Sequence, residues 1–164
     1  MDSNKDHEKI KRLALEFLKA HKTAVVATAS RSCEPQAATV FYSIDDDFTF
    51  NFVTDRNSRK YKNLLENPYI SIVVGVGPEV VTIQCGGHAE LVDYAKETAR
   101  AMKIAGKVII NSKLYFIPPS LPVLMNLTVE LGIFIVKPSW MVMLDLEYQK
   151  DPQTFAKNYQ RVLP

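Results

Sequence analysis

In several short segments of the chain, apolar residues occur at every second position, a pattern that predicts antiparallel β-strands with one face in a core. The clearest example is Phe48–Thr54, where phenylalanine recurs three times in alternation with Thr, Asn and Val. The pair Gly86-Gly87 lies inside another such segment and predicts a β-bulge or a sharp bend. The remaining strands are expected at Thr23–Ser30, Gln36–Ile44, Tyr69–Val76, Val80–Val92, Gly132–Lys137 and Trp140–Leu146. Tyr69–Val76 is nearly continuously apolar, which predicts a strand that is buried on both faces.

Three other segments repeat their apolar residues every three or four positions, which predicts helices. The first precedes Thr23, the second starts after Asn57 or Ser58 and is stopped by Pro68, and the third covers Tyr94–Gly106. The side chains expected to face the core are Ile10, Leu13, Ala14, Phe17 and Leu18 in the first helix, Tyr61, Leu64 and Leu65 in the second, and Ala95, Ala99, Met102 and Ala105 in the third.

The first three strands follow one another without a helix between them, which argues against a parallel βαβ sheet. These short strands, with two or three short helices and brief connections, predict a mainly β fold, a small antiparallel barrel with peripheral helices. No repeat or linker divides the chain, so residues 1–164 are expected to form one domain. The proline-broken stretch Lys107–Asn126 is expected to be a packed loop or a cover over a site or subunit interface, and the tail after Tyr148 a short helix or an irregular segment.

Composition narrows the classes of function. A hydrophobic content of 47% in 164 residues fits one domain with a full core, and a net charge of +2 provides no global field for nucleic acid or an anionic membrane. The two cysteines, Cys33 and Cys85, lie far apart, which argues against a disulfide framework and against a zinc site. Neither a signal peptide nor an apolar run of about 18 residues is evident, so a cytoplasmic location is expected.

The segment Thr54–Lys60 carries the most informative chemistry, because it places Arg56, Arg59 and Lys60 around the start of the second helix. A helix N-terminus bears about half a positive charge and exposes unpaired N–H groups, so it favours acidic side chains. Each cation there costs on the order of 0.3–1 kcal/mol. A bound phosphate dianion would remove this cost.

Such a phosphate would accept hydrogen bonds from the backbone N–H groups, Ser58 and Thr54, and would pair with Arg59 and Lys60. The alternative is a solvated basic turn that Asp55 partly compensates. The pattern by itself leaves both interpretations open.

Structural roles are the more common interpretation for the other residues that could carry chemistry. A strand histidine such as His88 is more often a surface or interface residue than a ligand. Three adjacent carboxylates, Asp45–Asp47, are typical of a polar hairpin turn rather than a metal site. Cys85 and Trp140 fit positions in the core or at a subunit contact. No Ser/His/Asp or Cys/His constellation and no metal site are expected.

The run Phe52-Val53-Thr54, followed by Ser58-Arg59-Lys60, Asn63-Leu64 and Asn67-Pro68, resembles the FMN-binding split-barrel superfamily of pyridoxamine 5′-phosphate oxidase. A looser resemblance extends over Thr23–Val92. It implies a six-stranded antiparallel split β-barrel of Greek-key type, FMN as the cofactor, and a homodimer that builds its flavin site across two subunits.

The resemblance also implies the residues of the cofactor site. Arg59 and Lys60 would hold the FMN phosphate, with Ser58 shaping the turn. Val53 and Thr54 would lie along the flavin and ribityl chain, and the backbone of Ala38–Ser43 would meet the ring edge. The full expected set is Val40, Phe41, Tyr42, Val53, Thr54, Ser58, Arg59, Lys60 and one or both of Thr82 and Gln84.

Differences from the oxidase limit how much of its function the resemblance implies for this chain. Ala38 and Ser43 stand where the oxidase has Arg and Lys, Leu144 stands where it has an aromatic residue, and its C-terminal Arg/His substrate motif has no counterpart in Asp151–Pro164. We therefore expect an FMN-dependent oxidoreductase acting on a small molecule other than pyridoxamine phosphate, with a reduced nicotinamide among the candidate donors. The alternatives are a non-catalytic flavin, deazaflavin or haem binder or redox sensor, and a barrel for protein interaction whose basic turn is only surface.

Overall fold

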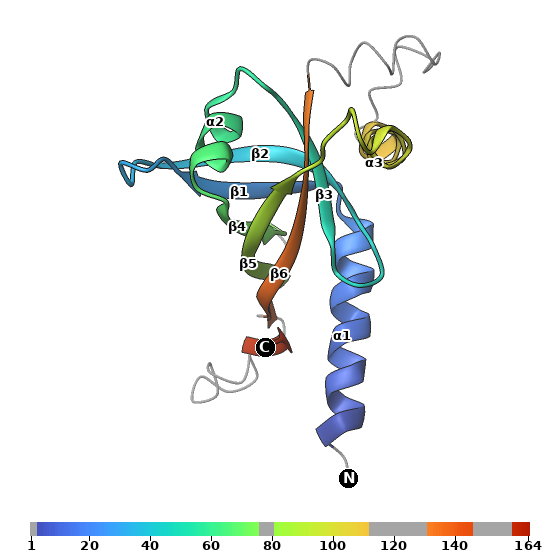
Figure 1. Ribbon diagram of the computed structural model, residues 1–164. Helices are drawn as coiled ribbons and strands as arrows, with labels where there is room; N and C mark the ends of the chain where they lie inside the picture. The colour runs from blue at the N-terminus through green and yellow to red at the C-terminus, as the bar shows by residue number, and fades with distance from the viewer. Residues whose placement is uncertain (1–2, 76–80, 112–130, 146–158) are drawn as a thin grey trace.

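The computed structural model describes residues 3–75, 81–111, 131–145 and 159–164 as a strongly curved sheet with three helices around it (Figure 1). The helices are α1 (Ser3–Ala20), α2 (Arg59–Glu66) and α3 (Thr98–Asn111). The strands are β1 (Thr23–Ala29), β2 (Pro35–Ile44), β3 (Phe50–Asp55), β4 (Tyr69–Val74), β5 (Val81–Leu91), β6 (Leu131–Asp145) and β7 (Tyr159–Leu163).

Six of the strands close into an antiparallel barrel. They are ordered β3-β2-β1-β4-β5-β6, and β3 also pairs with β6, so the sheet has no free end among these six. β7 lies outside the ring and pairs with the last part of β6. The predicted fold class, a mainly β protein with a six-stranded antiparallel barrel and peripheral helices, is confirmed.

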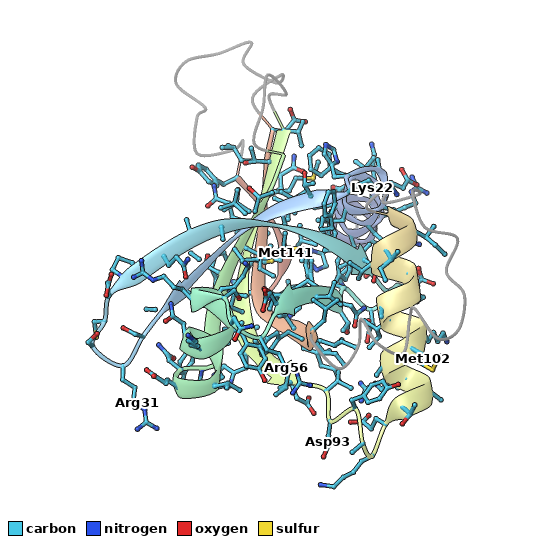
Figure 2. All side chains as sticks on the ribbon, turned by 90° about the horizontal axis from the view of Figure 1, so that it is seen from above. Lys22, Arg31, Arg56, Asp93, Met102 and Met141 are labelled. Carbon is cyan, nitrogen blue, oxygen red and sulfur yellow. The ribbon has the colours of Figure 1, made fainter. Side chains whose placement is uncertain are left out.

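The barrel interior is filled by aromatic and branched side chains from alternate strand positions. Phe52 and Phe134 stack with ring centroids 5.4 Å apart, and Tyr42 lies 5.2 Å from Phe50. Each of these four residues is at most 1% exposed. Figure 2, which views the barrel from above, shows Met141 near its centre. Cys85 is also buried in this core, as expected, and burial raises the pKa of its thiol to about 12.

Helix α1 lies against the barrel through Ala14 and Leu18, both fully buried. The Tyr42 hydroxyl donates a 2.6 Å hydrogen bond to the Leu18 carbonyl, which ties the end of the helix to β2. The predicted stripe is correct for these residues, but Leu13 is 40% exposed because it lies beyond the edge of the contact. Leu65 of α2 is likewise exposed, whereas Tyr61 and Leu64 are buried as predicted.

Helix α3 forms a second, smaller core on the outer side of β3 and β6. Its side chains Ala101, Ile104, Ala105 and Val108 pack on Ile133 and Ile135. The predicted face was partly wrong: Ala105 is buried, but Ala95 and Ala99 are exposed, and Met102 lies on the side of α3 that faces away from the barrel (Figure 2).

The difference arises because a turn that begins at Asp93 takes up the residues that were expected to form the start of this helix. The Asp93 side chain accepts from the Ala95 N–H at 3.1 Å, and its carbonyl accepts from Glu97 at 2.8 Å. The regular helix consequently begins at Thr98 and continues to Asn111. The first five residues of the proline-broken stretch are therefore helical and not a loop, and its remainder, residues 112–126, lies outside the described residues.

The strand predictions need three corrections. β6 is one strand over Leu131–Asp145, not two. The predicted irregularity at Gly86-Gly87 is confirmed. The pairing register between β5 and β6 shifts at these glycines, opposite Pro138, and β6 continues past the shift as one strand. β4 alternates between buried and half-buried or exposed residues instead of being buried on both faces. β7 is a strand in the tail that was expected to be helical or irregular, and only Val162 in it is fully buried, too weak a pattern to recognise.

The hairpin acids Asp45–Asp47 act as structural anchors. Asp46 pairs with Lys19 of α1 at 2.5 Å, and Asp45 pairs with Lys107 of α3 at 2.7 Å. Asp47 accepts from the backbone N–H of Thr49 at 3.1 Å. Among the described residues no group of His, Cys, Asp or Glu is arranged to hold a metal ion. No described helix is long and apolar enough to cross a bilayer.

Two glycines provide a matched test of this packing. Gly132 lies beneath the ring of Tyr61, and a Cβ added there would collide with that ring, whereas a Cβ on Gly106 in α3 would meet no atom within 4 Å. We expect Gly132→Ala to lower the free energy of unfolding by about 1–3 kcal/mol through overpacking. Gly106→Ala should raise it by about 0.5–1 kcal/mol, since alanine is the better helix former. Urea unfolding followed by circular dichroism measures both changes, and equal effects of the two variants would contradict this packing.

Candidate functional site

The connection from β3 to α2 forms the predicted turn with Ser58 as its N-cap. The Ser58 hydroxyl accepts from the Tyr61 N–H at 3.3 Å and donates to the Asp55 carbonyl at 2.7 Å. The Thr54 hydroxyl lies 3.0 Å from the Ser58 hydroxyl. Because the Ser58 proton is already donated to Asp55, Thr54 is the donor in this contact. The two hydroxyls predicted to meet a phosphate are thus engaged with the protein itself, and their first effect is to fix the shape of the turn.

The cap satisfies only one of the first N–H groups of α2. An α-helix provides no intrahelical acceptor for its first N–H groups, and Ser58 serves only that of Tyr61. The N–H groups of Arg59 and Lys60 remain for an external acceptor. No acidic residue lies in the first turn of the helix. No acid of α2 therefore offsets the partial positive charge of the helix N-terminus.

The structure supplies one negative charge that the sequence did not reveal. The Arg59 guanidinium forms an ion pair with Glu34, which precedes β2 and is 25 residues away in the chain. Both side chains are more than 60% exposed, so the pair contributes little to stability. Arg56 is directed elsewhere, with its Nε 3.3 Å from the Leu131 carbonyl. Lys60 is half-buried and completes the cationic part of the turn.

An open seam in the barrel adjoins this turn. β2 pairs with β3 only over Tyr42–Ile44, although it pairs with β1 over the whole of Pro35–Phe41. Beyond Phe52, β3 pairs only with β6. The edge of Pro35–Phe41 that faces β3 therefore has no strand partner among the described residues, and every second residue there directs its backbone groups into the seam. Figure 1 shows the two strands diverging from their shared end.

The predicted residues on β2 and β3 differ in orientation. Phe41 is 40% exposed on the outer face of β2, while Val40 and Tyr42 point into the barrel core, so they can offer only backbone atoms to a ligand. Burial raises the pKa of the Tyr42 phenol far above its ordinary value. Val53 is half-buried against the α3 cluster, and Thr54 is 6% exposed beside Ser58.

Thr82 and Gln84 are not brought to the turn within one chain. They lie opposite Leu144 and Val142 of β6, whereas Thr54 lies opposite Gly132 of the same strand. The separations along β6 are ten residues for Gln84 and twelve for Thr82, which at about 3.3 Å each correspond to roughly 33 and 40 Å of strand. The Thr82 hydroxyl oxygen is buried and has no hydrogen-bond partner among the described residues. The predicted site is therefore divided between two ends of the barrel.

Sequence reasoning missed Glu34 and understated Asn63. Asn63 is only 8% exposed, and its side-chain amide donates to the Thr28 hydroxyl at 3.1 Å, which fastens α2 to β1. A buried polar residue on an otherwise apolar helix face was the available signal. Glu34 gave no signal, because its partner is determined only by the folded chain.

Comparisons with known proteins bear on this site. The sequence model of the pyridoxamine 5′-phosphate oxidase family matches residues 10–129. A pyridoxine/pyridoxamine 5′-phosphate oxidase of Ehrlichia ruminantium is 43% identical over 49 residues, which are 30% of this chain and only a quarter of that protein.

Several solved structures share the fold at low identity. A conserved hypothetical protein of Mycobacterium tuberculosis has a TM-score of 0.68 at 17% identity, over 82% of this chain and 83% of its own. A pyridoxamine 5′-phosphate oxidase-related FMN-binding protein of Nostoc punctiforme has a TM-score of 0.57 at 15% identity, over 84% and 83%. The haem storage protein HutZ of Vibrio cholerae has a TM-score of 0.55 at 17% identity, over 75% and 85%.

The family match covers most of the chain and includes the whole of the turn, α2 and the barrel strands β1 to β5. The sequence resemblance stated above is thereby confirmed. This chain belongs to the pyridoxamine 5′-phosphate oxidase family.

Proposed function

We propose that this protein binds FMN and transfers electrons or hydride to a small-molecule acceptor. The observation that carries the proposal is the Ser58-capped start of α2, where the N–H groups of Arg59 and Lys60 have no intrahelical acceptor, both side chains are cationic, and the first turn contains no acid. The match to the oxidase family and the FMN-binding relative from Nostoc support the same cofactor.

The residues present fit the phosphate end of FMN. The two N–H groups and the two cations would hold the phosphate, as helix N-termini do with anions. Glu34 would be displaced from Arg59 by the dianion, which is favoured because an exposed ion pair is weak. Ser58 and Thr54 would keep the turn in shape.

The seam between β2 and β3 fits the ring end. Its unpaired backbone groups would hydrogen-bond the polar edge of the isoalloxazine, and the exposed Phe41 would lie beside the ring. When bound, the flavin supplies the redox chemistry, and the protein supplies position and electrostatics. This division of labour accounts for the lack of an acid–base pair among the residues at the seam.

A homodimer completes the proposed site. Thr82 and Gln84 are far from the turn in their own chain, so they would reach the flavin only from a second copy. The unpartnered, buried Thr82 hydroxyl is consistent with a contact that one chain does not provide. Each dimer would then contain two sites, each with a turn from one chain and a β5 strand from the other.

A haem-binding role is the second candidate, and a separate cavity favours it. A cavity of about 600 Å³ lies on the outer side of β1, β4, β5 and β6, with Tyr69, His88 and Trp140 among its lining residues. The ring of Tyr69 meets that of His88 edge-on, with centroids 4.2 Å apart. An exposed imidazole in an aromatic-walled groove is suited to iron ligation.

The phosphate turn is tested by replacing its cations. Arg59→Ala/Lys60→Ala should weaken FMN binding at least about tenfold, because each charge-assisted contact to phosphate contributes about 1.4 kcal/mol or more. Riboflavin, which lacks the phosphate, should bind both proteins equally. Lys62→Ala on the exposed side of α2 is the matched control. Quenching of flavin fluorescence measures the affinities, and an unchanged preference for FMN over riboflavin in the double variant would contradict the assignment.

The shared site predicts complementation between two defective chains. Arg59→Ala/Lys60→Ala and Thr82→Ala/Gln84→Ala should each lose FMN affinity, and dimers formed by mixing them should recover one intact site. Light scattering should give twice the 18.5 kDa mass of one chain. A monomer, or mixed dimers that recover no binding, would overturn the two-chain arrangement while leaving the phosphate turn untouched.

The haem alternative is separated by spectroscopy. If it is correct, haem added to the purified protein gives a shifted Soret band that His88→Ala abolishes and His21→Ala leaves unchanged. If it is wrong, both variants behave like the parent protein and haem binds without a defined axial ligand.

A further inference from the structure

A second basic cavity lies at the opposite end of β3 from the phosphate turn. It has a volume of about 340 Å³ and is enclosed by the β2–β3 hairpin, α3 and β6. The six residues of β3, at about 3.3 Å each, place it roughly 20 Å from the start of α2. Its lining residues are Asp45, Asp47, Thr49, Asn51, Arg100, Lys103, Ile104, Lys107 and Lys137.

Four cations and two carboxylates line this cavity, which leaves a net charge of +2. One carboxylate is fully engaged: Asp45 accepts from Lys107 at 2.7 Å and from the Asn51 amide at 3.0 Å. Burial by itself would raise the pKa of Asp45, but these two hydrogen bonds and the charges of Lys107 and Lys103 outweigh it and lower the pKa. Asp45 is therefore ionised at neutral pH, and Lys107 is its counter-ion.

Of the other three cations, only Lys103 and Lys137 have no ion-pair partner among the residues that the structure describes. Arg100 pairs with Glu97 at 2.6 Å. Lys103 and Lys137 approach the cavity from α3 and β6, and in the described part of the chain no carboxylate lies within ion-pair distance of either. Lysines that served only to balance the hairpin acids would pair with them, as Lys19 and Lys107 do.

A buried hydroxyl adds a directed donor to this charge. Thr49 lines the cavity and is only 7% exposed, and its hydroxyl oxygen has no hydrogen-bond partner among the described residues. A buried polar group without a partner costs about 1–3 kcal/mol, so native proteins rarely keep one without a reason. A bound oxyanion would provide the acceptor.

We propose that this cavity binds a phosphate-type dianion, either as the free ion or as the terminal group of a phosphomonoester. Lys103 and Lys137 neutralise its two charges, and the Thr49 hydroxyl donates to one of its oxygens. Lys107 remains paired with Asp45, and this ion pair holds α3 against the hairpin at one side of the cavity. The site is independent of the flavin phosphate turn, because the two lie at opposite ends of β3.

Inorganic phosphate is the probe, titrated into the FMN-saturated protein at constant ionic strength with sodium chloride as the reference salt. We expect saturable binding by calorimetry and a rise in the thermal midpoint that chloride does not produce. Lys103→Gln/Lys137→Gln should raise the dissociation constant at least tenfold. Lys9→Gln/Lys62→Gln removes the same charge at exposed positions elsewhere and should leave it unchanged.

Thr49→Val separates a binding role from a packing role, since valine has nearly the same shape without the hydroxyl. Without phosphate, this variant should be as stable as the parent protein or more stable, because an unpartnered buried hydroxyl has been removed. With phosphate it should bind several-fold more weakly. Equal phosphate binding by the parent, the Lys103/Lys137 variant and the Thr49 variant would refute the proposal.

Glycerol 2-phosphate identifies the source of the anion. Binding at least as tight as that of inorganic phosphate indicates a phosphomonoester, and exclusion of the ester indicates the free ion. FMN affinity should be unaffected by Lys103→Gln/Lys137→Gln. If this variant loses FMN while Arg59→Ala/Lys60→Ala retains it, the flavin phosphate occupies this cavity and both assignments are overturned.

Discussion

β3 pairs with β6 along its whole length but with β2 over only three residue pairs, and the rest of the candidate site depends on that asymmetry. The full ladder to β6 closes the barrel. The short ladder to β2 releases that strand after Tyr42, so that it can follow β1 instead. A closed barrel normally leaves no strand edge unsatisfied. Here the edge of Pro35–Phe41 that faces β3 has no strand partner in the part of the chain that the structure describes, and it lies near the point where the chain leaves β3 and begins α2.

The surrounding structure holds this opening in place without filling it. Helix α2 is fixed to the barrel by Tyr61, which lies over Gly132, and by the Asn63–Thr28 hydrogen bond. At the other end, the hairpin acids hold α1 and α3 through Lys19 and Lys107. Both ends of β3 are therefore anchored by short-range polar contacts, while the apolar core stabilises the strand itself. A rigid scaffold of this kind positions a ligand without needing flexible loops.

The two basic regions at the ends of β3 differ in how their charge is arranged. At the turn, the cations lie at a helix N-terminus, and an exposed glutamate from the β1–β2 connection pairs with Arg59. In the hairpin cavity, Asp45 is paired with Lys107 and Asp47 accepts from a backbone N–H, while Lys103 and Lys137 have no ion-pair partner among the described residues. Both arrangements favour an anion. The turn does so through the geometry of a helix N-terminus, and the cavity does so through its excess of cationic over anionic side chains. The two regions are accordingly expected to differ in selectivity. The turn should select a terminal phosphate group of a ligand, and the cavity should select anions by their negative charge.

The sequence by itself determined the elements and the barrel class, since local periodicity, Pro68 and the Gly86-Gly87 pair act over a few residues. It also limited the cap to Asn57 or Ser58 and placed Arg59 and Lys60 beyond it, because capping is a local interaction; the structure selects Ser58.

Only the tertiary structure decided the rest. The phase of α3 depended on the turn at Asp93, and the β7 pairing depended on where β6 ends. The partner of Arg59, the separation of Thr82 from the turn and the excess of lysines in the hairpin cavity all join residues distant in the chain. Such contacts follow from strand register and helix docking, which the whole core determines, and no pattern in a short stretch of sequence carries that information.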